Sequence, residues 1–281
     1  MNPKARALLV KSLRSILLTA IVIYAFINLA GVWLQNAAMF PVPPVLQKES
    51  PPWEFTLETA DGIPIRAVWL GNPDAKMTIL FSHGNGEDID RIIHFLGELR
   101  FQGFNVLAYD YRGYGRSGGA PSERGLERDI TAAYEWLTTT QQIAPERIIL
   151  MGRSIGGGPS VWLATQKPVA GLILESAFTS AYEVLLPRLP YYRNPFPNES
   201  RLRNLRVPTL FIHGTHDMLI APGHAKRNYA AAAGPKELVW IPLAGHNDVM
   251  ATDMDTYIYS LVRFARGLEP QESGPQIVER E

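Results

Sequence analysis

A serine flanked by glycines is the feature of this sequence best suited to chemistry. Residues 152–156 read GRSIG, so Ser154 stands at the centre of a G-x-S-x-G pattern. The preceding residues IILM are typical of a buried strand, and three glycines open the next segment, which has helical character. A tight turn from strand to helix leaves little room for side chains beside the serine. The pattern predicts a nucleophilic serine at a helix N-terminus, where free N–H groups favour a developing anion.

A serine hydroxyl needs an imidazole to accept its proton and a carboxylate to orient that imidazole. Among the six histidines, His246 lies in a turn just after the strand-like run ELVWIP. Asp217 lies in the loop beyond another such run, TLFIH, at the same expected edge of the sheet as Ser154. We therefore expect these three residues to form a catalytic triad. Asp248 is a rival acid, but it is only two residues from His246, which makes orienting that ring awkward.

Stabilising the oxyanion of acyl transfer requires two N–H donors. One is expected from the backbone of Ile155, the residue after the serine. The other is expected in the loop 82–86, SHGNG, whose small residues let backbone N–H groups point at a ligand. We favour Asn85 as this donor, with Gly84 as the alternative. His83 is interpreted as a structural residue that packs the loop.

No metal and no cofactor are expected. His213 and His216 precede Asp217 at a spacing that could suggest a metal site, but no further ligand cluster accompanies them. The loop 82–86 is not a G-x-G-x-x-G fingerprint, and the sequence contains no GK[ST] phosphate loop, which disfavours nucleotide binding. It has no cysteine, which excludes disulfides, thiolate metal sites and cysteine nucleophiles. Acidic and basic residues balance at 27 each, so no basic field favours binding to nucleic acid.

The elements that must position these residues alternate along the chain. An Asp61-Gly62 turn between two strand-like runs, 53–59 and 64–70, predicts a β-hairpin. Further strands are expected at 77–82, 105–109, 147–151, 169–174, 209–213 and 237–241, and helices at 89–100, 127–138, 159–165, 225–233 and 255–266. This alternation predicts an α/β fold with an eight-stranded, mostly parallel sheet and helices on both faces.

The first forty residues form a separate segment. Residues 16–34 run for about nineteen positions without a charge, nearly enough to span a hydrocarbon layer of ~30 Å. Because four cations precede this run and only Lys48 follows it closely, the positive-inside rule predicts a single membrane-spanning helix with a cytoplasmic N-terminus. The rest of the chain would then lie on the extracytoplasmic side. A cleaved signal peptide, which would give a secreted protein, and a buried or interfacial helix are the alternatives.

Composition suggests where the segments of the chain begin and end. We expect a membrane anchor at 1–40, a stiff proline-rich spacer at 41–52, a folded domain at 53–268 and a flexible tail at 269–281. Within the domain, residues 180–206 are too long for a simple crossover and are interpreted as either a small cap or a long crossover helix. An acyl-binding pocket could draw its apolar walls from Phe178, Leu185, Tyr191 and Phe196.

Five segments together resemble the α/β-hydrolase superfamily in order and spacing: SHGNGED, AYDYRGYGRSGG, GRSIGGGPS, LFIHGTHD and AGHND. The resemblance covers about 53–268. It is strongest to lidless or small-capped α/β-hydrolase domain proteins, which include membrane-anchored serine hydrolases. Monoacylglycerol lipases, protein depalmitoylases and S33-like serine aminopeptidases share these motifs. The resemblance implies the same triad, Ser154, Asp217 and His246, and a mainly structural role for the loop 110–117.

The expected reaction is acyl transfer to water through an acyl-enzyme. Cleavage of esters or thioesters is favoured, and the membrane anchor suggests a lipid-like or acylated substrate. A serine peptidase is one alternative, although the sequence offers no obvious acidic cluster to recognise a peptide N-terminus. A non-catalytic, membrane-anchored scaffold is the other.

Overall fold

The computed structural model describes residues 3–46, 49, 51–185 and 194–269. Within them, eight strands form one sheet in the order β1-β2-β4-β3-β5-β6-β7-β8. The hairpin of β1 (Glu54–Glu58) and β2 (Pro64–Leu70) joins the sheet antiparallel to β4, and all other neighbours are parallel. The remaining strands are β3 (Thr78–Ser82), β4 (Asn105–Tyr109), β5 (Ile148–Arg153), β6 (Gly171–Glu175), β7 (Thr209–Gly214) and β8 (Lys236–Ile241).

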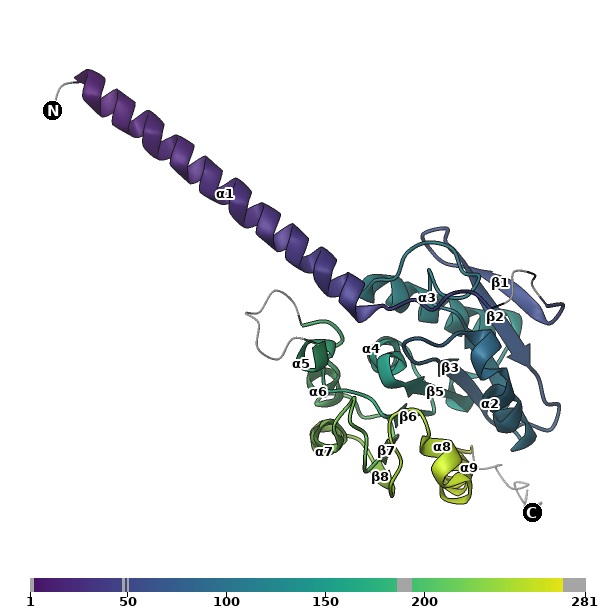
Figure 1. Cartoon of the computed structure of the whole chain (residues 1–281). Helices are drawn as coiled ribbons and strands as arrows, with labels where there is room; N and C mark the ends of the chain where they lie inside the picture. The colour runs from purple at the N-terminus through teal and green to yellow at the C-terminus, as the bar shows by residue number, and fades with distance from the viewer. Residues whose placement is uncertain (1–2, 47–48, 50, 186–193, 270–281) are drawn as a thin grey trace, which may run out of the picture.

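Helices cover both faces of this sheet, so the predicted α/β architecture is confirmed (Figure 1). On one face, apolar side chains of the sheet pack against α2 (Ile89–Phe101) and α9 (Met254–Leu268). On the other, they pack against α3 (Glu123–Glu135) and α4 (Gly157–Gln166). The strands from β3 to β6 are buried almost throughout, as expected of strands covered on both sides. Shorter helical elements are a π-helical turn (Trp136–Thr140), a 3₁₀ turn (Pro145–Arg147), α5 (Ala181–Leu185), α6 (Asn198–Leu202), α7 (Pro222–Ala231) and α8 (Val249–Thr252).

The observed helices differ from the expected ranges mainly at their ends. α3 begins at Glu123, four residues before the predicted start, because the Ser122 hydroxyl accepts a hydrogen bond from the Gly125 N–H and caps the helix. The segment 180–206, interpreted from the sequence as either a small cap or a long crossover helix, contains the two short helices α5 and α6. Residues 186–193, between them, lie outside the described part of the chain.

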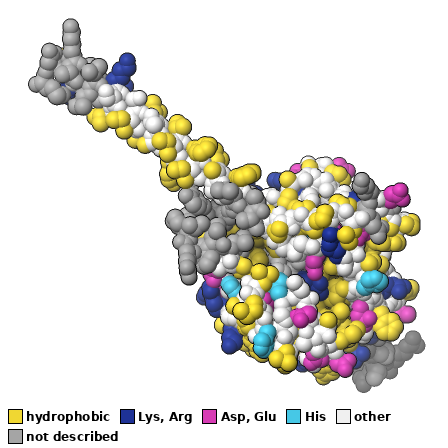
Figure 2. Space-filling model, viewed as in Figure 1, with side chains coloured by type: hydrophobic (Ala, Val, Ile, Leu, Met, Phe, Trp, Pro, Cys, Tyr) yellow, Lys and Arg dark blue, Asp and Glu magenta, His cyan; other side chains and the backbone are white. Residues whose placement is uncertain are grey.

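A single helix, α1 (Pro3–Met39), precedes the sheet domain and projects away from it (Figure 1). Its segment Val10–Gly31 is long and apolar enough to cross a membrane, and none of it is buried within the protein. Apolar side chains line this helix on the face seen in Figure 2. A helix that exposes Leu29 and Phe26 in this way, each more than two-thirds exposed, has the composition of a membrane anchor.

Candidate active site

Ser154 stands at the turn between β5 and α4, at the carboxyl edge of the sheet. It begins a 3₁₀ turn (Ser154–Gly156) and has a positive φ of 54°, a strained conformation for a residue with a side chain. The glycines around it are required by crowding. A Cβ on Gly156 would lie 2.1 Å from the carbonyl oxygen of Ser82, and one on Gly152 would lie 2.4 Å from that of Gly156. The local sequence therefore allows a turn that few other residues could form.

The structure brings the three predicted triad residues into one hydrogen-bonded row. The Nε2 atom of His246 lies 3.0 Å from the Oγ atom of Ser154, and its Nδ1 atom lies 2.7 Å from a carboxylate oxygen of Asp217. Asp217 follows β7 and His246 follows β8, so both extend from the same sheet edge as Ser154. Because a carboxylate only accepts hydrogen bonds, Nδ1 carries the proton and Nε2 faces the serine hydroxyl as an acceptor.

Asp217 is nearly fully buried and held by several donors. Besides His246, the backbone N–H groups of Leu219 and Ile220 donate to its carboxylate at 2.9 and 2.7 Å. Burial by itself would raise the pKa of Asp217, but the hydrogen bonds from His246 and Ile220 outweigh it and hold that pKa below its ordinary value. The group is therefore a carboxylate at neutral pH, as an orienting acid must be.

The alternative acid and the histidine considered as a metal ligand make other contacts. Asp248 accepts a hydrogen bond from the Gly245 N–H at 2.6 Å and so braces the turn that carries His246. His213 donates from Nε2 to the carbonyl oxygen of Ile220, and burial lowers its pKa. Across the described residues, no group of three or more His, Cys, Asp or Glu side chains lies close enough to hold a metal ion.

The loop after β3 distinguishes between the two proposed second oxyanion donors. The backbone N–H of Gly84 already donates to the Glu87 carboxylate at 2.6 Å. Asn85 uses its side chain for structural contacts, donating to the Met39 carbonyl oxygen at 2.6 Å and accepting from the Tyr114 hydroxyl at 2.6 Å. These contacts fix the position of Asn85 beside Ser154 and leave its backbone N–H as the better candidate.

His83 packs this loop from within, as its structural interpretation required. Its ring is fully buried, lies 4.1 Å from the ring of Tyr111 between centroids, and donates from Nδ1 to the carbonyl oxygen of Gly84 at 2.8 Å. Burial lowers the pKa of His83, so the ring is neutral.

A small, mostly apolar cavity of about 100 Å³ opens beside the serine. Its lining includes Ser154 and both expected oxyanion residues, Ile155 and Asn85. The other walls are Met39, Phe178, Ala181, Val184, Leu219 and Ile220. All of these side chains are uncharged, so the cavity suits an apolar group attached to the carbonyl that reaches Ser154.

Of the four residues expected to form an acyl pocket, the structure places Phe178 in this wall. Phe196 is instead fully buried in the core and packs against Gly158, where a Cβ would meet its ring at 2.3 Å. Apolarity alone could not distinguish a pocket wall from a core position. The side chain of Leu185 and the whole of Tyr191 lie outside the described residues.

Comparison with known proteins places this chain in a family. The family described as "Serine aminopeptidase, S33" matches residues 73–191. The human alpha/beta hydrolase domain-containing protein 17B is 39% identical over 199 residues, which cover 69% of each chain. The chain belongs to the α/β-hydrolase family. Membership makes it a hydrolase of that family, in agreement with the resemblance inferred from its motifs.

A further relative and a solved structure agree with this assignment. The Caenorhabditis elegans protein aho-3 is 42% identical over 180 residues, and this match spans 63% of the present chain and 54% of the worm protein. Among solved structures, an esterase from Pyrococcus furiosus superposes with a TM-score of 0.67 at 18% identity, covering 80% of this chain and 98% of its own. At that identity the likeness supports the α/β-hydrolase fold.

Sequence reasoning missed an ion-pair network directly behind the nucleophile of this α/β-hydrolase. Arg153 pairs with Glu87 at 3.1 Å and with Glu175 at 3.0 Å, and its guanidinium lies 4.3 Å from the ring centroid of Phe95. Burial opposes the charge of Arg153, but the two carboxylates outweigh it and keep its pKa above the ordinary value. The only sequence signal was a charged residue next to the serine at the end of a buried strand.

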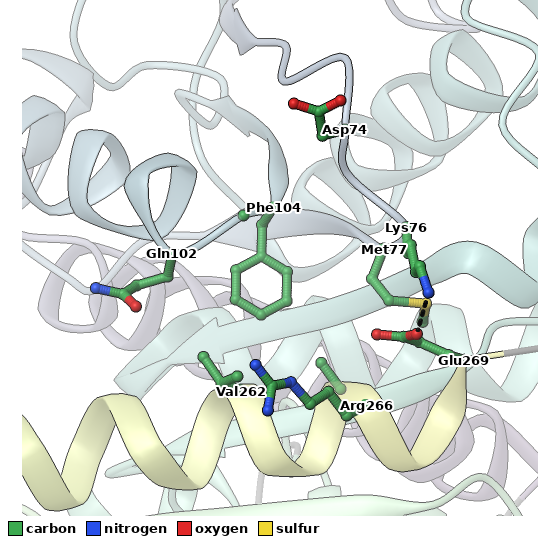
Figure 3. A pocket seen from close by; sticks show the side chains of 10 residues that line it. Asp74, Lys76, Met77, Gln102, Phe104, Val262, Arg266 and Glu269 are labelled. Carbon is green, nitrogen blue, oxygen red and sulfur yellow. Dashed lines mark ion pairs between the residues drawn. The ribbon is translucent and has the colours of Figure 1, made fainter.

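A second cavity of this α/β-hydrolase, about 190 Å³, lies between α9 and the residues that precede β3 and β4 (Figure 3). Met77 and Phe104 line it at the amino ends of those strands, whereas Ser154 follows the carboxyl end of β5. At its rim, Lys76 pairs with Glu269 at 3.2 Å. The cavity therefore lies at the edge of the sheet opposite the candidate active site.

Proposed function

We propose that this protein is a serine hydrolase that cleaves ester or thioester bonds through an acyl-enzyme on Ser154. The observation that carries the proposal is the row of hydrogen bonds from Ser154 to His246 and on to Asp217, at 3.0 and 2.7 Å, beside an apolar cavity. A row with this order and these distances can remove the serine proton as the hydroxyl attacks a carbonyl.

In the first half of the reaction, Ser154 Oγ attacks the carbonyl carbon and His246 Nε2 takes its proton. Negative charge then develops on the carbonyl oxygen, and the backbone N–H groups of Ile155 and Asn85 donate to it. Asp217 stabilises the imidazolium by its charge and its hydrogen bond to Nδ1. His246 returns the proton to the leaving alcohol or thiol, which departs and leaves the acyl group on Ser154.

In the second half, water replaces the leaving group. His246 accepts a proton from water as its oxygen attacks the acyl carbon, and the same two N–H groups hold the second oxyanion. Collapse of this intermediate breaks the bond to Ser154 Oγ, which takes back the proton from His246. The products are the free carboxylic acid and the regenerated enzyme.

An acyl chain is the substrate portion that best fits the site. The cavity wall contains aliphatic and aromatic side chains, and Leu219 is both part of that wall and 61% exposed, so apolar surface continues outwards from the cavity. The anchor α1 would hold this opening near a membrane. We therefore propose lipid-like or acylated molecules as substrates.

The positive-inside rule supports an N-terminus in the cytoplasm and a hydrolase domain on the opposite side of the membrane. Four cations precede the uncharged run 16–34, namely Lys4, Arg6, Lys11 and Arg14. Retention of the helix is favoured over cleavage because its last residue, Met39, is buried against the domain.

The test is to label the full-length chain, purified in detergent, with a fluorophosphonate and to assay it with acyl esters of increasing length. Ser154→Ala should abolish labelling and lower the ester kcat by at least ~1,000-fold. The matched control is Ser160→Ala, six residues along in α4. Its hydroxyl is buried with no hydrogen-bond partner among the described residues, so its removal should leave labelling unchanged.

The same assay separates the alternatives. Matched thioesters and amino-acyl anilides are offered to the wild-type protein in parallel with the esters. Cleavage of the anilides as well as the esters would favour a peptidase, the activity that the matched S33 family description names, whereas cleavage of esters alone would exclude it. A folded protein that neither labels nor hydrolyses any of these compounds would eliminate the hydrolase mechanism and favour a membrane-anchored scaffold.

A further inference from the structure

We infer that the membrane anchor does more than tether the enzyme: its last residue, Met39, forms a wall of the acyl pocket and determines which acyl chains are accepted. The inference rests on the proposed function, since it concerns the substrate of the same site. It assigns a specificity-determining role to a residue outside the sheet domain.

Among the described side chains of α1, those in its apolar segment are exposed, whereas its last residue is buried. Leu29 and Trp33 are 72% and 69% exposed, as expected of a helix in contact with lipid. Met39 is only 2% exposed, and Phe40, directly after the helix, is 6% exposed. Met39 lines the cavity that contains Ser154 and joins the same apolar core as Phe178. The helix end is therefore docked into the active site.

Polar contacts hold the helix end in this place. The last carbonyl groups of a helix have no partner within it, and the Asn85 side chain satisfies that of Met39 at 2.6 Å. The same Asn85 is fixed on its other side by the Tyr114 hydroxyl. Farther along, Arg91 of α2 donates to the carbonyl oxygen of Pro44 at 2.9 Å. Asn85 therefore caps the anchor helix with its side chain, while its backbone N–H is the proposed donor to the oxyanion.

The length of α1 sets the height of this pocket above the membrane. The apolar span ends at Gly31 and Met39 lies eight residues later, which corresponds to about 12 Å along a helix. The polar headgroup layer occupies roughly 5–8 Å on each side of the hydrocarbon core. The pocket therefore lies just beyond the headgroups, where a chain drawn from the adjacent leaflet needs to travel only a short way. This placement favours substrates whose acyl chain is held in the same membrane.

The test compares Met39→Ala and Met39→Trp in the full-length protein, with Val42→Ala as the control. Val42 follows the helix by three residues, is 40% exposed and is not part of the cavity lining. The measurement is kcat/KM for p-nitrophenyl esters from four to sixteen carbons, in detergent and in vesicles. Each methylene of the acyl chain that becomes buried in the pocket, or is excluded from it, should change kcat/KM about fourfold.

Met39→Trp should fill the cavity and lower kcat/KM for long chains relative to the four-carbon ester by at least ~10-fold. Met39→Ala should move the optimum to chains about two carbons longer or to branched acyl groups, and Val42→Ala should keep the wild-type profile. Opposite shifts in the two variants cannot arise from a general loss of folded protein. The rate of fluorophosphonate labelling at Ser154 reports in parallel how much active enzyme each sample contains.

An unchanged chain-length profile in both Met39 variants, with Ser154 labelled as in the wild type, would overturn the inference and leave the proposed function standing. A uniform loss of activity on short and long esters alike would also overturn it, because Met39 would then only support the fold. Absence of labelling and hydrolysis in the wild type itself would instead refute the proposed function, and the inference with it.

Discussion

The Glu87 carboxylate accepts a hydrogen bond from the backbone N–H of Gly84 at 2.6 Å, and this contact braces the loop whose Asn85 lines the cavity together with Ser154. Arg153, the residue before Ser154, pairs with the same carboxylate. Burial would raise the pKa of Glu87, but Arg153 and the Gly84 N–H outweigh it and hold that pKa below its usual value. The loop with the proposed oxyanion donor Asn85 is thus tied to the residue next to the nucleophile by a charged, partly buried contact.

Replacing Glu87 by alanine should therefore impair catalysis more than binding. The variant frees the Gly84 N–H and loosens the position of Asn85, so we expect kcat on esters to fall about 10- to 100-fold while KM changes less than ~3-fold. Steady-state kinetics on the purified full-length protein give both quantities. The control is Glu135→Ala on the exposed surface of α3. A wild-type kcat in Glu87→Ala would show that the contact has no part in positioning the oxyanion loop.

The choice between Asp217 and Asp248 as the orienting acid can be tested with a matched pair of substitutions. Asp217→Asn keeps the size of the side chain but removes the charge that stabilises the imidazolium of His246, so kcat should fall by about 10⁴-fold. Asp248→Asn retains an oxygen that can accept from the Gly245 N–H, and it should lower kcat by less than ~10-fold. Similar losses in the two variants would contradict the proposed role of Asp217.

The order of elements, the sheet and the neighbourhood of the triad could all be predicted from the sequence. Ser154, Asp217 and His246 each follow an apolar strand-like run, and in a parallel sheet the ends of such runs meet at one edge. Local pattern was sufficient because each residue is placed by the strand directly before it. The strand order was not predicted, because neighbours such as β4 and β3 are chosen by packing between segments far apart in the chain.

Contacts across the fold were not accessible from local pattern. The apolar run of α1 indicated a membrane helix, but nothing in it indicated that Met39 would be buried beside Ser154. Phe196 was expected in the pocket on apolarity alone. Its ring instead packs against Gly158, where the missing side chain leaves room for it, and it is buried in the core. Arg153 has partners from β6 and from the loop after β3, which no spacing around the G-x-S-x-G pattern could reveal.

The nucleophile turn should tolerate no side chain at Gly156, whereas a glycine elsewhere should be replaceable. A Cβ at Gly156 would lie 2.1 Å from the Ser82 carbonyl oxygen, so Gly156→Ala must displace backbone and should lower Tm by at least ~5 °C or prevent folding. Gly97 in α2 has nothing within 4 Å of an added Cβ, so Gly97→Ala should leave Tm unchanged or raise it, because a helix interior favours alanine over glycine by up to ~1 kcal/mol. Thermal unfolding in detergent measures both. Equal Tm values for Gly156→Ala and the wild type would refute the tight turn.

The buried His83 should make the stability of the protein depend on pH below neutrality. Burial lowers the pKa of His83 in the folded state, while an unfolded chain binds the proton with an ordinary pKa of about 6.5. Below pH ~6.5 the unfolded state therefore takes up a proton that the folded state does not, and the free energy of unfolding falls by up to ~1.4 kcal/mol per pH unit. Buried His213 and partly buried His224, whose pKa values burial also lowers, act in the same direction.

Comparison with His83→Asn isolates the contribution of this residue. Asparagine can still donate to the Gly84 carbonyl oxygen but does not titrate, so the variant is expected to be less stable at every pH yet less sensitive to acid. Between pH 7.5 and 5.5, its Tm should fall by about 3 °C less than that of the wild type. Thermal unfolding of both proteins at several pH values in one detergent gives the two slopes. Parallel slopes would mean that His83 is protonated equally in the folded and unfolded states, contrary to its burial.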